Sequence, residues 1–178
     1  QQPPAGRSDP TILTKRFVRF QFLDKHGPVE TFQAWDQRLE RHVLFKIYRQ
    51  DVIRRAARMK RLVREVKQLA GVTNPHVARI LDFGRQEQLA YVAVEPGEGI
   101  PLLQAVRHFR LQAIEIVTLL MQAADGLAAA ADVDVLHRNI NPNVLLVTNE
   151  GFAKICDFGL GLFVGTTRLH GVTRSGYL

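Results

Sequence analysis

The chain has 178 residues, of which 46% are hydrophobic and 23% charged, and its formal net charge is +7. This apolar content is enough for one core or two small lobes and excludes a disordered chain, while the positive charge leaves nucleic-acid binding open. The one cysteine, Cys156, excludes an intrachain disulfide and is typical of a reducing compartment, and no signal peptide or apolar run of membrane length is evident, so we expect a cytoplasmic protein without a membrane segment.

The first half of the chain has the pattern of an antiparallel sheet. Residues 1–13 begin with a stretch rich in Gln, Pro, Gly and Ser, which predicts a flexible leader. Residues 14–95 follow as one predicted lobe, a twisted antiparallel sheet with one main helix. Within it, Arg16 to Leu23 alternates like a strand and Val43 to Tyr48 is a second strand candidate.

The predicted helix of this lobe is strongly basic. Eight cationic residues lie in or just before it: Arg49, Arg54, Arg55, Arg58, Lys60, Arg61, Arg64 and Lys67. Its apolar positions form one inward stripe: Ile53, Ala57, Leu62, Val66 and Leu69. The basic face is either merely solvated or a phosphate-binding surface, and we favour the first, because no aromatic residues interleave the cations as single-strand binding requires.

Residues 96–178 are predicted to begin with a mainly helical segment, which short strands follow. Leu102 to Val133 is predicted to be helical, because apolar residues recur in steps of three and four: Ile114, Val117, Leu120, Met121, Ala124 and Leu127. Short strands near Val144 to Val147 and Ala153 to Cys156 should flank a turn at Glu150-Gly151.

Two motifs in this second half resemble a known family. The run His137-Arg138-Asn139-Ile140-Asn141-Pro142-Asn143-Val144, followed by Asp157-Phe158-Gly159, is similar to the catalytic core of bacterial-type serine/threonine protein kinases. The resemblance covers about residues 14–178. It implies an α+β, kinase-like fold, with an N-lobe of antiparallel sheet and one helix over 14–95 and a partial, mainly helical C-lobe over 96–178 that runs through the activation segment.

The same resemblance implies a nucleotide pocket. Lys46 would grip the α- and β-phosphates, with Glu65 as its ion-pair partner, and Asp157 would bind one magnesium ion. Val94, as gatekeeper, and Glu95, at the hinge, would line the pocket. His137 and Phe158, together with Leu69, would belong to a hydrophobic spine that needs no ligand.

Several residues depart from the family pattern at positions that carry chemistry. Asn139 replaces the catalytic aspartate, and an amide is not a base, so a factor of roughly 10²- to 10⁴-fold in rate should be lost. Val144 replaces the metal-binding asparagine, and a valine offers Mg²⁺ no oxygen ligand. The remaining departures are Asn141 in place of a lysine, Leu44 in place of a small residue beside the adenine, and Asp24, His26 and Val29 in place of the three glycines of the phosphate loop.

Two functional hypotheses follow. The favoured one is a pseudokinase-like regulatory or protein-interaction module with impaired nucleotide binding and phosphoryl transfer, for which no cofactor is expected. The alternative is an atypical but active serine/threonine kinase that uses ATP and Mg²⁺ through Lys46, Glu65 and Asp157, with Asn143 holding a metal ion. A nucleic-acid module that uses the basic helix is a third, less favoured hypothesis.

The resemblance also predicts a covered surface. The sequence ends at Leu178, before the Ala-Pro-Glu motif with which relatives continue into further helices. Those helices normally cover the apolar face between Ile114 and Leu127. We therefore expect that the chain is a piece of a longer protein, or that a protein partner or a second copy covers this face.

Overall fold

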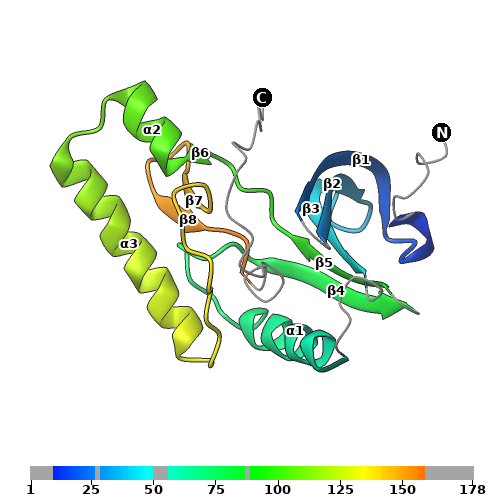
Figure 1. The fold of residues 1–178 in the computed structure, drawn as a ribbon. Helices are drawn as coiled ribbons and strands as arrows, with labels where there is room; N and C mark the ends of the chain where they lie inside the picture. Colours follow the sequence, from blue (N-terminus) through cyan, green and yellow to red (C-terminus); the bar gives the residue numbers. More distant parts are fainter. Residues whose placement is uncertain (1–9, 27–28, 50–55, 87–88, 159–178) are drawn as a thin grey trace. The chain divides into compact units, whose positions relative to one another are not determined.

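The computed structural model describes residues 10–26, 29–49, 56–86 and 89–158, which fall into two compact units (Figure 1). The sheet unit comprises Gln1–Val66 and Ile80–Pro96, and the helical unit comprises Lys67–Arg79 and Gly97–Leu178. Sequence patterning placed Lys67–Arg79 in the first lobe. It groups with the helical unit because the backbone of residues 76–78 is hydrogen-bonded to strand β8 (Ala153–Ile155).

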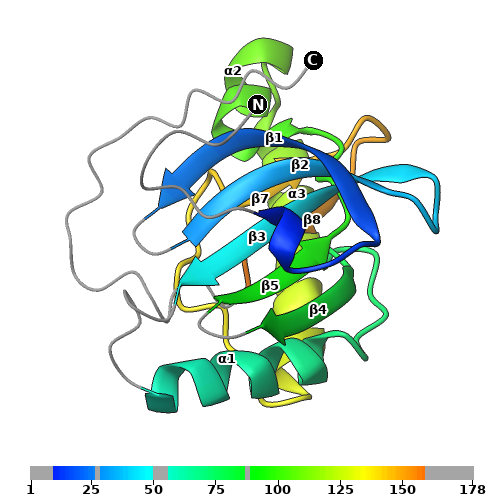
Figure 2. The ribbon, with the colours of Figure 1, turned by 90° about the vertical axis from the view of Figure 1, so that its right-hand side faces the viewer.

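Within the described residues, five antiparallel strands form the sheet in the order β1-β2-β3-β5-β4 (Figure 2). The expected strands over Arg16–Leu23 and Val43–Tyr48 correspond to β1 and β3, with their ends moved by one to three residues. The strand bounds are β1 Phe17–His26, β2 Val29–Asp36, β3 Arg41–Arg49, β4 Ile80–Gln86 and β5 Leu89–Val94.

One face of this sheet is packed with aromatic rings. Phe45 stacks on Tyr91 with ring centroids 4.8 Å apart, and Phe17 lies 5.2 Å from Phe45. Leu13 is buried in the same cluster, after a 3-10 turn at Pro10–Ile12. Residues 10–13 of the predicted leader are therefore ordered, because the apolar side chain of Leu13 packs against the sheet. Residues 1–9 of the predicted leader lie outside the described ranges.

Helix α1 spans Ala56–Leu69. Met59, Leu62, Val66 and Leu69 are all buried, so the inward stripe predicted from the sequence is confirmed at its last three positions. Lys60, Arg61, Arg64 and Lys67 are exposed. The helix is therefore amphipathic in the sense that the sequence indicated.

In the helical unit, two helices replace the single helix predicted over Leu102–Val133. Helix α2 (Leu102–Phe109) ends at Arg110, which has a left-handed φ of 52°. Helix α3 (Ala113–Ala131) starts from a capping box in which Gln112 and Glu115 satisfy each other's backbone N–H groups. The continuous-helix prediction is wrong because these two cap structures end one helix and begin the next.

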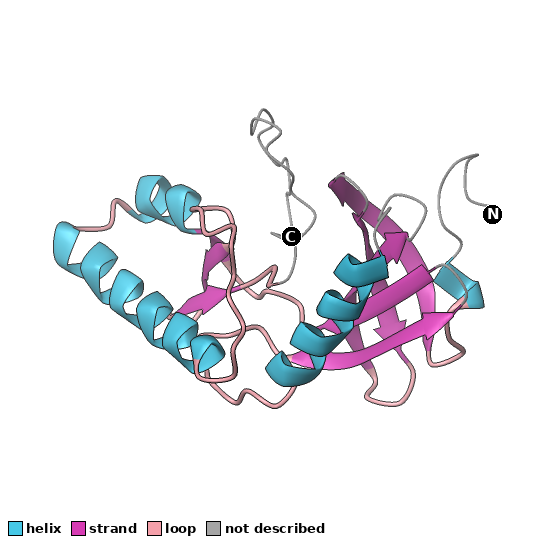
Figure 3. Cartoon of the chain, turned by 60° about the horizontal axis from the view of Figure 1, so that its bottom comes forward, coloured by secondary structure: helices cyan, strands magenta, loops and turns pink. Residues whose placement is uncertain are grey.

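Helix α3 packs on β8 through Leu119 and Ala123. The buried positions are Leu119, Ala123, Gly126 and Ala130, and strands β6 (Ile100–Pro101), β7 (Leu145–Val147) and β8 form the adjoining sheet (Figure 3). The turn expected at Glu150-Gly151 joins β7 and β8, with Gly151 at a φ of +83°. The opposite face exposes large apolar side chains: Ile114, Val117, Leu120 and Met121.

Length and composition alone would let α3 cross a membrane. It is the one such helix in the described part of the chain. Its most apolar 18-residue stretch has a mean hydropathy of 1.4, and 22% of that stretch is buried. A core helix of a globular domain passes the same test, so this is weak evidence for a membrane span. The absence of a membrane segment and the cytoplasmic location stay predictions.

Candidate functional site

The loop 137–144 of the helical unit is anchored through its histidine. His137 is 3% exposed, and its Nε2 lies 2.7 Å from the backbone oxygen of Cys156. Its ring also contacts Phe158 edge-on at a centroid distance of 4.6 Å, as the spine interpretation predicts. This pair fixes the loop against the segment that carries Asp157.

Two charged residues next to this pair have left-handed backbone conformations. Arg138 has a φ of 64° and Asp157 a φ of 67°. Such conformations are uncommon for residues other than glycine and persist only where surrounding contacts hold them. The backbone geometry around the predicted metal ligand Asp157 is therefore a constrained one.

Asparagine side chains brace the same loop from within. The Nδ2 of Asn141 donates to the backbone oxygen of Asn139 at 2.9 Å, and its Oδ1 accepts the backbone N–H of Asn143 at 2.9 Å. The backbone N–H of Asn139 in turn donates to Nδ1 of His137 at 3.3 Å. Asn141 thus uses both ends of its amide on the loop backbone, which a lysine at this position could not do.

Val144, at the predicted metal position, is 6% exposed. Its backbone oxygen accepts the N–H of Cys156 at 2.9 Å, and its own N–H donates to the oxygen of Asn141 at 3.1 Å. Asn143, the substitute metal ligand of the alternative hypothesis, is exposed. In the described residues no group of three His, Cys, Asp or Glu side chains is arranged to hold a metal ion.

In the sheet unit, strand register places the residues predicted for the phosphates on one face. Asp24 lies opposite Thr31, Thr31 opposite Lys46, and Lys46 opposite Val92. Directly opposite residues of antiparallel strands project from the same face. Lys46, which is 5% exposed, therefore shares its face with the carboxylate of Asp24.

A bulge in β1 sends Asp24 to this face. Phe22 pairs with Phe32 and Asp24 with Thr31, so Leu23 is the extra residue of the irregularity. Asp24 Oδ1 accepts the backbone N–H of Lys25 at 2.6 Å. A carboxylate thus occupies a backbone donor of the predicted phosphate loop, of which residues 27 and 28 lie outside the described ranges.

The other predicted pocket residues also belong to the sheet unit. Glu65 is 2% exposed and accepts a hydrogen bond from Nε of Arg61 at 2.8 Å. The ion pair predicted between Lys46 and Glu65 stays a prediction. Val94 ends β5 opposite Leu44 of β3, and the half-buried Glu95 follows it.

Sequence reasoning missed a polar cluster at the other end of the sheet. Arg16 binds Asp36 through Nε and Nη2, at 2.9 and 2.6 Å, and its Nη1 lies 3.3 Å from Asp82. Burial by itself raises the pKa of Asp36, but the hydrogen bonds from Arg16 and from two backbone N–H groups outweigh it, so this pKa lies below its ordinary value. No local signal could have found this pairing, whereas the spacing of four residues could have suggested Arg61 as a partner of Glu65.

The family of the chain follows from residues 27–176, which match the model of the protein kinase domain. The chain belongs to the protein kinase family. Its α+β fold, with an antiparallel N-lobe sheet, is the one that its kinase-like motifs predicted.

Curated relatives of this kinase domain are bacterial. The chain is 28% identical over 150 residues to a probable serine/threonine-protein kinase of Clostridium perfringens, covering 84% of this chain and 22% of that protein. It is 29% identical over 171 residues to the serine/threonine-protein kinase pkn2 of Myxococcus xanthus, covering 94% of this chain and 21% of that protein. The chain thus spans only about a fifth of the length of these two relatives.

Among solved structures, the PknI kinase domain of Mycobacterium tuberculosis has the same fold. The TM-score is 0.68 at 20% sequence identity, and the match covers 80% of this chain and 59% of that one. At this identity the likeness shows the fold and not the activity.

Proposed function

We propose that this chain is a pseudokinase-like domain of the bacterial serine/threonine kinase family, a regulatory or protein-interaction module with impaired nucleotide binding and phosphoryl transfer. The observation that carries this proposal is the loop 137–144. Its hydrogen bonds hold it in place, yet it presents an amide at Asn139 and a buried methyl-bearing side chain at Val144. Neither group supplies the base or the metal ligand that phosphoryl transfer requires.

The face of Lys46 supports the same proposal. A triphosphate on this face would meet the negative charge of Asp24. It would also find the N–H of Lys25 already taken by that carboxylate. Both effects oppose the electrostatic and backbone contacts by which such loops hold phosphates.

Two observations favour the alternative, an active kinase. Asp157 keeps a constrained left-handed backbone, and Lys46 and Glu65 are both buried. That hypothesis needs Asn143 as a metal ligand, however. The backbone N–H of Asn143 is hydrogen-bonded to Asn141, and its side chain is exposed. Asn143 therefore does not occupy the buried position that Val144 fills.

Thermal unfolding with ATP and Mg²⁺ separates the two hypotheses. A ligand that binds only the folded state, present at about a hundred times its Kd, stabilises it by about 2.7 kcal/mol. We expect no shift for the wild-type chain and none for Lys46→Met, and we expect Asp24→Asn to gain a shift if its charge is what repels the phosphates. A magnesium-dependent shift of the wild type that Lys46→Met abolishes, together with transfer of radiolabelled phosphate to a generic protein substrate, would establish the active kinase instead.

A further inference from the structure

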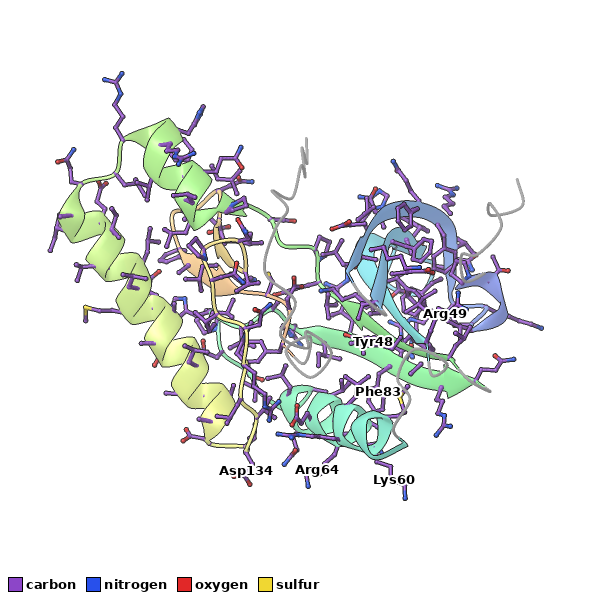
Figure 4. The ribbon with its side chains drawn as sticks, in the orientation of Figure 1. Tyr48, Arg49, Lys60, Arg64, Phe83 and Asp134 are labelled. Carbon is purple, nitrogen blue, oxygen red and sulfur yellow. The ribbon has the colours of Figure 1, made fainter. Side chains whose placement is uncertain are left out.

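Three cations form a single row along α1, which we call the basic row: Lys60, Arg64 and Lys67. Their spacing of four and then three residues places them one above the other on one side of the helix. All three are exposed, and Figure 4 shows Lys60 and Arg64 projecting from the side of α1 that lies away from β4.

In the part of the chain that the structure describes, no carboxylate pairs with the basic row. The first turn of α1 contains no acidic residue, and the one carboxylate within the helix, Glu65, is buried and binds Arg61. No ion pair or hydrogen bond of the three side chains occurs within the described ranges. Like charges at these spacings destabilise a helix, so an external anion that binds there would be favoured electrostatically.

The chemistry around the row narrows the class of partner. Between residues 59 and 69, Met59, Leu62, Val66 and Leu69 are buried and Val63 is half-buried, so this part of the helix offers no exposed apolar face for insertion into a lipid surface. No aromatic residue lies between the three cations to stack on a nucleobase. These observations disfavour lipid insertion and single-stranded nucleic acid, and we favour a protein segment with carboxylates over a nucleic-acid duplex.

The geometry favours a helical segment. The row extends over about 10 Å, or two helical turns at roughly 1.5 Å per residue. Carboxylates placed four and three residues apart on a second helix repeat at the same interval, so three ion pairs could form together without distorting either helix.

We propose that the basic row is a docking surface for an acidic helical segment of a partner protein. This inference goes beyond the proposed function, because it uses neither the nucleotide pocket nor the loop 137–144. It applies to an active and to an inactive kinase domain alike.

Charge reversal with a charge-matched control tests the proposal. The test variant is Lys60→Glu/Arg64→Glu/Lys67→Glu. The control is Lys15→Glu/Arg38→Glu/Arg41→Glu, which reverses three exposed cations of the sheet unit outside α1 and changes the net charge by the same amount. Circular dichroism and thermal unfolding show whether each variant folds, and the neutral variant Lys60→Gln/Arg64→Gln/Lys67→Gln replaces the test variant if it does not.

The probe is a fluorescent helical peptide with glutamates at positions i, i+4 and i+7, beside a peptide of the same composition in scrambled order. By anisotropy we expect the ordered peptide to bind the wild type and the control alike and to bind the test variant at least about tenfold more weakly, since several ion pairs are lost together. Equal binding of both peptides, or undiminished binding by the test variant, would overturn the proposal. Tighter binding of a DNA duplex that the test variant loses would also overturn it, in favour of a nucleic-acid surface.

Discussion

At Gly126, helix α3 packs closely against the backbone of residue 76. A Cβ at residue 126 would lie 2.9 Å from the backbone oxygen of His76 and 3.1 Å from its Cβ, closer than ordinary carbon contacts. His76 is unable to yield easily, because its oxygen accepts the N–H of Ile155 at 2.8 Å and its Nδ1 lies 2.8 Å from the oxygen of Ala153. Gly126→Ala therefore pushes α3 away from the segment that is bonded to β8.

The magnitude follows from two opposing effects. Replacing a helical glycine by alanine gains about 1 kcal/mol of helix propensity. Overpacking against a fixed backbone costs about 1–3 kcal/mol. We expect a net loss of about 1 kcal/mol in the free energy of unfolding, or roughly 2–4 °C in Tm for a chain of this size.

Chemical denaturation by urea measures this loss. The matched control is Ala124→Gly on the exposed side of α3, which should lose about 1 kcal/mol through helix propensity alone. If Gly126→Ala instead raises the stability by about as much as Ala124→Gly lowers it, propensity dominates and the close approach of α3 to His76 carries no energetic weight.

Three further predictions concern other parts of the fold. Gly99→Ala should destabilise the helical unit by more than about 2 kcal/mol in urea denaturation, because Gly99 has a φ of +142° and a Cβ there would overlap the backbone of Val147; a loss below about 0.5 kcal/mol would contradict this. Asn141→Ala should cost about 1–2 kcal/mol through two lost hydrogen bonds, in the same assay, whereas an equal loss in the exposed control Asn143→Ala would refute the bracing role. Because the pKa of Asp36 is lowered in the folded state, its carboxylate stabilises the fold above the ordinary value of 3.8 and this stabilisation is lost as the pH falls through the lowered pKa. Asp36→Asn should thus be destabilised at neutral pH and show a flatter stability profile between about pH 5 and 2 than the wild type, and parallel profiles would contradict the assignment.

Short-range signals predicted the parts of the fold that depend on neighbouring residues. The turn at Glu150-Gly151 and the strands on either side of it were found, because a glycine between two short apolar runs is a local sequence pattern, and in the structure Gly151 has a positive φ. The break between α2 and α3 had a signal as well, since Gln112 and Glu115 have the spacing of a capping box. It was missed because apolar periodicity continues across Arg110.

The family resemblance, and not apolar periodicity, indicated which face of α3 is exposed. This helix is apolar on most of its circumference, so periodicity could not decide which side is buried. The recurring residues from Ile114 to Met121 are exposed, whereas Ala123 packs in a cluster with β8 and Gly126 approaches the backbone of His76. Gly126 fits there because the backbone of His76 approaches α3 closely, and only the tertiary structure reveals this approach.

The candidate site also combines features that the sequence predicts with features that depend on tertiary structure. Motif spacing assigned roles to Lys46, His137 and Asp157, because the residues between them follow the spacing of the family, and these roles stay predictions. The face of Asp24 depends on one bulge at Leu23, and a shift of one residue moves a side chain to the other face of a sheet. Strand register is a property of two strands together, so the proximity of this carboxylate to the face of Lys46 could not be read from β1 alone.

The replaced residues are integrated into the architecture of the loop 137–144. Asn141 braces the loop through its amide, and backbone atoms and the His137 ring make further hydrogen bonds there. Val144 adds a buried apolar side chain where a metal-binding amide would need a ligand to offset its burial. Under the proposed function, the missing base and metal ligand remove chemistry without removing the hydrogen bonds that shape the loop. Restoring Asn139→Asp and Val144→Asn should therefore lower the stability even as it returns the missing groups.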